Sequence, residues 1–189
     1  MPLDTIAAIH ARYSCRAFSD VMPPDAALRT IAEAAAASPS GMNRQLWRVV
    51  VVKRRPLIDA MDAEGVRNLA AFPDKRLYER IQARGGTLYY NAPCVMVIPI
   101  AKVEPAGAEL FDGGIVAENI ALAAASLGID SLICGFSAFS FAGERCAEFK
   151  EQLGFPEGYD IGISVLLGYA ETPGGKPHTP DLSKISWVE

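Results

Sequence analysis

Hydrophobic residues recur every three or four positions along much of the chain, a spacing that predicts amphipathic helices. In the first of them Leu3, Ile6 and Ile9 share one face, and the pattern ends near Arg12. The same spacing predicts further helices over residues 25–37, 56–84, 109–128 and 143–153. Gly128 is expected to end the longest well-defined one.

Short runs rich in apolar and β-branched residues interrupt this pattern and predict buried strands. They occupy residues 47–52, 93–100, 131–136 and 161–167. No internal repeat or linker divides the chain, so we expect one α+β domain over residues 1–189, with about four strands covered by helices. From Thr172 onward Pro and Gly are frequent, which predicts an extended arm. Trp187 could anchor this arm on a partner subunit, and packing on its own domain fits about as well.

Composition narrows the class of protein. The chain has 189 residues, 50% hydrophobic and 21% charged, as in ordinary globular proteins. Its net charge of −4 gives no reason to expect nucleic acid or an anionic membrane as a partner. Its apolar runs are too short or too interrupted to span a bilayer, and no secretion signal leads the chain, so we expect a cytoplasmic location. The four cysteines, at 15, 94, 134 and 146, lack CxxC spacing, so no metal site is expected.

The sequence RYSCR, residues 12–16, follows the first predicted helix. If the backbone is extended there, Arg12, Ser14 and Arg16 project to one side, because side chains alternate in such a segment. Two guanidinium groups and a hydroxyl would suit a phosphate monoester through charge-assisted hydrogen bonds. The plainer alternative is two surface arginines, with Arg12 balancing the dipole of the helix. Taken alone, the stretch fits this alternative better.

A loop of small and amide residues, Ser38 to Trp47, joins the second helix to the first strand. Its backbone amides, with Asn43 and Gln45, could pair with the polar edge of a planar heterocycle. The alternative is an ordinary turn in which Asn43 satisfies local backbone groups, and in isolation the turn fits better.

The third predicted strand ends in Cys134-Gly135-Phe136. Glycine at the end of a strand lets the flat face of a ligand approach the backbone. Cys134 is interpreted as a small buried side chain rather than a nucleophile, because nothing in the sequence brings either of the two histidines beside it.

Lys176 and His178 lie two residues apart in the predicted arm. In an extended segment they would point the same way and could give positive charge to a phosphate. A solvated tail is the alternative, and by itself the better one. The chain has no GxGxxG after a strand and no P-loop, so neither device for binding nucleotides is expected.

These stretches occur together in a fixed order. The order is RxSxR, SPSxxNxQxW, YNAP before a strand, an AENIALAAASLGI helix, a strand ending in glycine, and LLGYA followed by KPHTP. Over essentially its whole length the chain resembles the nitroreductase family of FMN-dependent oxidoreductases. The resemblance implies a nitroreductase-like α+β fold: a mixed or antiparallel sheet of four to five strands, flanked by helices, with an extended C-terminal arm.

The resemblance also implies a homodimer with two FMN sites at its interface, each built from both subunits. Arg12 would hold the phosphate, with Lys176 and His178, and Arg16 would lie by the pyrimidine edge of the ring. The loop over residues 39–43 would come from the partner, and the strand end would run under the ring. By position, the implied flavin-binding residues are Arg12, Tyr13, Ser14, Arg16, Pro39, Ser40, Asn43, Ile133, Cys134, Gly135, Lys176 and His178. No contact is assigned within residues 64–84.

Some residues depart from the family's usual pattern. Leu46 stands where proline commonly follows glutamine, Cys134 where a carboxylate or small residue is often found, and His178 where arginine is frequent. These departures concern affinity and choice of substrate more than flavin binding.

The activity implied is hydride transfer from NADH or NADPH to an organic acceptor, such as a nitroaromatic or a quinone, with ping-pong kinetics. The flavin would perform the chemistry, no side chain would be an essential acid, and Arg16 would stabilise negative charge on the ring. Alternatives are a specialised flavin chemistry (dehalogenation, enone reduction or flavin destruction), a flavin-binding protein without turnover, and a dimeric interaction module without a cofactor.

Overall fold

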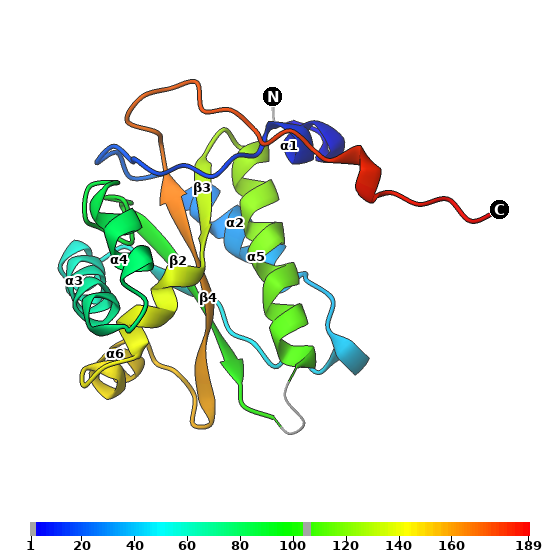
Figure 1. Ribbon diagram of the computed structural model, residues 1–189. Helices are drawn as coiled ribbons and strands as arrows, with labels where there is room; N and C mark the ends of the chain where they lie inside the picture. Colours follow the sequence, from blue (N-terminus) through cyan, green and yellow to red (C-terminus); the bar gives the residue numbers. More distant parts are fainter. Residues whose placement is uncertain (1–2, 104–106) are drawn as a thin grey trace.

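A four-stranded sheet with strand order β1-β2-β4-β3 runs through the middle of the molecule (Figure 1). All neighbouring strands pair antiparallel. The structure is a computed structural model that describes residues 3–103 and 107–189. The strands are β1 (Val50–Val52), β2 (Cys94–Ala101), β3 (Asp130–Cys134) and β4 (Tyr159–Gly168). The predicted α+β class is confirmed, and the sheet is antiparallel.

Helices flank the sheet on both sides (Figure 1). They are α1 (Thr5–Ala11), α2 (Asp25–Ala36), α3 (Arg55–Ala71), α4 (Lys75–Gln82), α5 (Ala108–Ser126) and α6 (Cys146–Gln152), with short 3₁₀ helices η1 (Gly41–Asn43), η2 (Gly135–Phe141) and η3 (Leu182–Lys184). The helical pattern predicted over 56–84 is thus two helices. Gly128, at φ 72°, follows α5 as predicted.

The core is divided by the sheet into two hydrophobic clusters. Val95 and Val97 of β2 face one cluster, which includes the buried side of α3 and residues of η2. Met96 and Ile98 face the other cluster, which includes residues of α2 and α5. Because successive side chains of a strand point to opposite faces and both faces are covered, the strand is a continuous apolar run.

Two strands are shorter than the sequence predicts. In the segment predicted over 47–52, only Val50–Val52 pair regularly, and Trp47 forms an isolated bridge with Ile100. Pro99 of β2 has no N–H to donate to β1 between these points, which interrupts the ladder. The strand predicted over 131–136 ends at Cys134, where η2 begins.

The C-terminal arm is extended, as predicted. Residues 171–189 are exposed along their whole length, and η3 is the regular structure that the arm contains. In Figure 1 the end of the arm leads away from the domain. Trp187 is 87% exposed, so it does not anchor the arm on its own domain.

Candidate functional site

A pocket of about 450 Å³ opens at the C-terminal end of β3. It combines arginines with aromatic side chains and with the residues of the strand end. The residues that line it are Arg16, Arg80, Arg84, Tyr90, Leu132, Ile133, Cys134, Gly135, Phe136 and Phe139. We call it the β3 pocket.

Arg16 reaches this pocket because the segment after α1 pairs with β3. Ser14 forms a parallel bridge with Ser131, and the Cys15 amide donates a hydrogen bond of 2.9 Å to the Ser131 carbonyl. This pairing lays the next residues along the strand toward its C-terminal end. The Arg16 Nη1 donates to the Ser14 carbonyl at 3.3 Å, a long hydrogen bond that leaves the other guanidinium donors available to an anion.

Gly135 lies at the point where β3 turns into η2. The turn is held by the Ser137 hydroxyl, which donates a 2.7 Å hydrogen bond to the Cys134 carbonyl. A Cβ atom placed on Gly135 would meet nothing within 4 Å. The space over this backbone is therefore open, and a flat ligand can lie against it.

Cys134 packs beneath the pocket. Its side chain is buried, and its thiol donates to the Leu88 carbonyl at 3.5 Å. Burial raises the pKa of the Cys134 thiol to about 12. Because the thiolate is the reactive form of cysteine, this residue is unsuited to nucleophilic catalysis at neutral pH.

Arg80, in the last turn of α4, and Arg84, two residues after the helix ends at Gln82, bring two more guanidinium groups to the β3 pocket. Both residues are exposed. Ile81 between them is fully buried, which fixes the rotation of the helix about its axis. Gly85 and Gly86, at φ 98° and 74°, then turn the chain back toward the core.

Tyr90 lines the pocket from a strained turn. Tyr90 and Asn91 have positive φ values of 49° and 64°, which non-glycine residues rarely adopt. The Asp62 carboxylate holds the preceding residues by accepting hydrogen bonds from the Leu88 amide at 2.7 Å and the Tyr89 amide at 3.2 Å. Burial raises the pKa of Asp62, although these two hydrogen bonds act in the opposite direction. The buried carboxylate thus supports the aromatic wall.

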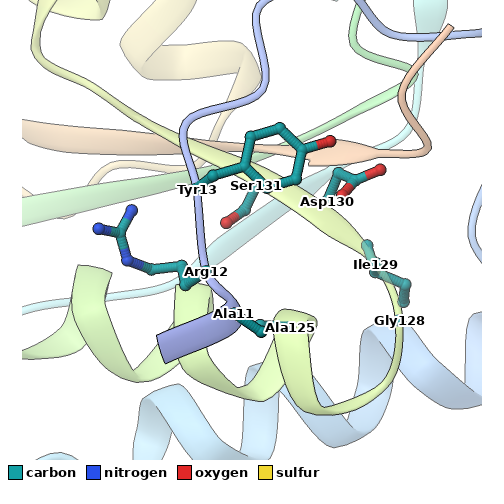
Figure 2. A pocket seen from close by; sticks show the side chains of 8 residues that line it. All are labelled: Ala11, Arg12, Tyr13, Ala125, Gly128, Ile129, Asp130 and Ser131. Atoms are coloured by element: carbon teal, nitrogen blue, oxygen red, sulfur yellow. The ribbon is translucent and has the colours of Figure 1, made fainter. Parts of the chain in front are cut away.

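A smaller pocket of about 150 Å³ lies at the other end of β3 (Figure 2). It is lined by Arg12 and Tyr13, and in Figure 2 the Arg12 guanidinium points away from the Tyr13 ring. The Arg12 Nε lies 3.7 Å from Glu118 Oε1 on α5. Arg12 and Arg16 therefore line separate pockets, because Ser14 pairs with the strand between them.

The C-terminal arm crosses the segment after α1 at Tyr13. Gly175 lies so close to the ring that a Cβ atom on it would fall 1.9 Å from Tyr13 Cε2. Lys176 and His178 follow this crossing directly, and both are exposed. Burial and then the nearby Asp130 carboxylate raise the pKa of Tyr13, so the hydroxyl keeps its proton throughout the physiological range.

The loop that contains Pro39, Ser40 and Asn43 lies elsewhere. Ser40 Oγ accepts a hydrogen bond from the Gln45 amide at 2.9 Å, and Gln45 Nε2 donates to Asn43 Oδ1 at 2.8 Å. Met42, Asn43 and Gln45 all have positive φ. In Figure 1, η1 lies on the opposite side of α5 from α4, so the loop lines neither pocket of its own chain.

The sequence matches the model of a known family over most of its length. The family model described as the nitroreductase family matches residues 9–169, a range that includes both pockets. The chain belongs to the nitroreductase family.

Solved and curated members resemble this nitroreductase-family chain over most of its length. A nitroreductase with bound FMN from Desulfitobacterium hafniense is 52% identical, with 100% of each chain covered and a TM-score of 0.95. A nitroreductase with bound FMN from Bacteroides fragilis is 28% identical, with 99% of this chain and 100% of that chain covered and a TM-score of 0.88. A curated relative from Archaeoglobus fulgidus is 30% identical, covering 85% of this chain and 82% of its own, and its name assigns it provisionally as an NADH dehydrogenase or NAD(P)H nitroreductase.

Within residues 3–103 and 107–189, no group of three or more His, Cys, Asp or Glu side chains gathers as metal ligands would. No described helix is both long and apolar enough to cross a membrane. All four cysteines are free thiols.

The structure of this nitroreductase-family chain brings together only some of the residues predicted from sequence. The β3 pocket collects Arg16 with Ile133–Gly135, and the smaller pocket has Arg12 and Tyr13. Sequence reasoning missed the pocket residues Arg80, Arg84, Tyr90, Leu132, Phe136 and Phe139. Arg80 and Arg84 lie within the range 56–84 for which a helical pattern was predicted, but that pattern did not indicate which residues face a pocket.

Proposed function

We propose that this protein is an FMN-dependent oxidoreductase that transfers hydride from NADH or NADPH to an organic acceptor, such as a nitroaromatic or a quinone. The observation that carries the proposal is the β3 pocket, in which Arg16 lies with the Ile133–Gly135 strand end. Support comes from the 52% identity to a nitroreductase that binds FMN.

The residues of the β3 pocket suit a flavin ring. A volume of about 450 Å³ is in the range of small-molecule and cofactor sites. The open space over Gly135 would admit one face of a planar ring. Arg16 would provide N–H donors and positive charge at its pyrimidine edge.

Bound FMN would supply the hydride chemistry, and the chain would supply position and charge. The fixed cation of Arg16 would stabilise negative charge that develops beside it. Cys134 keeps its proton at neutral pH, so it is not expected to act as a nucleophile. Donor and acceptor would enter the same pocket in turn, which predicts ping-pong kinetics. The name of the Archaeoglobus fulgidus relative supports NADH or NADPH as the donor.

The phosphate of FMN would lie where the arm crosses the segment after α1. The contact between Gly175 and Tyr13 brings Lys176 and His178 to this segment. Arg12 contacts Glu118 through Nε, so its terminal nitrogens would remain for the phosphate. Basic residues of the arm and of the segment after α1 would then bind the same phosphate dianion.

A homodimer would complete the site. Phe111 of α5 is 78% exposed and Trp187 of the arm is 87% exposed, and such apolar surface is typical of interfaces. The loop with Pro39, Ser40 and Asn43 lies beyond α5 and would reach the flavin of the partner. The arm, which leads away from its own domain, would pack on that partner too.

An absorption spectrum from 300 to 550 nm tests the proposal. We expect flavin bands in the purified protein, and bleaching on anaerobic addition of NADH or NADPH. If the bound flavin does not bleach, the protein binds flavin without turnover. A protein that stays colourless after FMN is added would contradict the proposal altogether. Light scattering would measure the oligomeric state of the same sample.

A further inference from the structure

Arg80 and Arg84 line the β3 pocket but have no part in the proposed binding of flavin. Arg80 lies in the last turn of α4, and Arg84 lies two residues beyond Gln82, where the helix ends. Both are exposed, and within residues 3–103 and 107–189 neither guanidinium makes a hydrogen bond or ion pair. Both arginines bring positive charge to the pocket, which an anion bound there would neutralise.

The same helix contains an example of the pairing that these two arginines lack. Arg76 binds the Asp74 carboxylate in a bidentate manner, with hydrogen bonds of 2.9 and 2.8 Å. On α3, Arg67 pairs with Glu64 at 2.7 Å. Arg76 and Arg67 thus hold carboxylates through charge-assisted hydrogen bonds, the interaction that Arg80 and Arg84 could offer to a ligand.

The wall beside Arg80 and Arg84 is aromatic. The rings of Phe136 and Phe139 are stacked, with centroids 6.1 Å apart and planes at 28°, and Tyr90 also lines the pocket. Among the residues described here, the lining includes no Asp or Glu, although the chain as a whole has a net charge of −4. A flat conjugated body would pack against the rings, and an anionic group on it would meet the guanidiniums.

We propose that Arg80 and Arg84 bind the carboxylate of an aromatic, acidic electron acceptor. The inference rests on the proposed function, since the acceptor would be reduced by the flavin in the same pocket. It adds the class of substrate: a planar conjugated acid rather than a neutral nitroaromatic or quinone.

The test compares two acceptors that differ in charge, 4-nitrobenzoate and 4-nitrobenzamide. The quantity measured is the ratio of their kcat/KM values, in the parent and in Arg80→Gln, Arg84→Gln and the double variant. Taking the ratio removes any effect on the reduction of the flavin. Loss of a hydrogen bond to a charged group changes affinity by about tenfold or more. We therefore expect the ratio to fall about tenfold in each single variant and further in the double variant. Arg76→Gln, on the same helix but paired with Asp74, is the matched control and should keep the parent ratio.

Calorimetry with benzoate and benzamide gives a readout that needs no turnover. Benzoate should bind more tightly than benzamide to the parent, and this preference should disappear in the double variant. An unchanged ratio in the double variant would overturn the inference. A variant with a raised KM for NADPH but not for NADH would also overturn the inference, because the arginines would then bind the 2′-phosphate of the donor. Loss of FMN from the variants would overturn it as well, because the arginines would then bind the cofactor. Failure of the proposed function itself appears separately, as a parent protein without flavin bands.

Discussion

Gly135 offers a substitution with opposite effects on folding and on flavin binding. Its φ is not positive, and a Cβ atom would meet nothing within 4 Å. Replacing a glycine at a compatible position stabilises a protein by about 0.4–1 kcal/mol, because the unfolded chain loses freedom. Gly135→Leu should therefore fold at least as stably as the parent.

The same side chain would occupy space over the strand end, where the flavin ring is proposed to lie. Forcing an extra group into an occupied site costs about 1–3 kcal/mol. Since each 1.4 kcal/mol is a factor of ten, affinity for FMN should fall by about 5- to 150-fold. Gly135→Ala, with a single methyl, should give a smaller loss.

Titration of apoprotein with FMN, followed by flavin fluorescence, measures the affinity. Thermal unfolding of the apoprotein by circular dichroism measures the stability, free of any contribution from bound ligand. Ala138→Leu is the matched control, because Ala138 is exposed in η2 and does not line the pocket. Parental affinity in a folded Gly135→Leu protein would show that the ring does not lie over this backbone.

Three further predictions concern the phosphate, the buried thiols and the arm. Arg12→Ala should weaken FMN binding by about 1.5–3 kcal/mol in the same titration, with Arg76→Ala unchanged; equal losses in both would refute the phosphate assignment. Burial raises the pKa values of Cys94 and Cys134 from 9.0 to about 12, so between these pH values the folded state holds more protons than the unfolded state. The free energy of unfolding should then fall with rising pH by about 1.4 kcal/mol per unit for each thiol, and urea titrations at pH 9–11 should show the slope become smaller by this amount when both are replaced by alanine. An unchanged slope in that variant would contradict the role given to these two thiols. Deleting residues 172–189, which are exposed, should weaken the proposed dimer by at least about 2 kcal/mol without unfolding the domain; an unchanged dimer in sedimentation would contradict the role given to the arm.

Local patterns determined much of the fold. Helical spacing located α1, α2 and α5, and continuous apolar runs located β2 and β4, because each signal depends on burial of residues within one element. Glycine after α5 marked its end because only a residue without a side chain turns there cheaply. The short β1 was harder to predict, since its pairing depends on Pro99, which belongs to another strand.

The functional site, too, was only partly predictable from local sequence patterns. RYSCR and the strand end before η2 were recognisable as motifs, and two of their residues, Arg16 and Gly135, do line one pocket. Arg12 lines a different pocket because of the bridge between Ser14 and Ser131. This bridge joins segments that are more than a hundred residues apart in sequence.

The sequence by itself determined the family, the class of fold and the chemical type of several site residues. Only the tertiary structure decided which charged groups share a cavity. Arg80 and Arg84 became pocket residues because burial of Ile81 rotates α4 and because two glycines end the helix beside the strand end. Which residues of a helix face a pocket depends on how the helix packs on the sheet. The sequence pattern of a helix is the same whichever way the helix is turned, so it does not predict this packing.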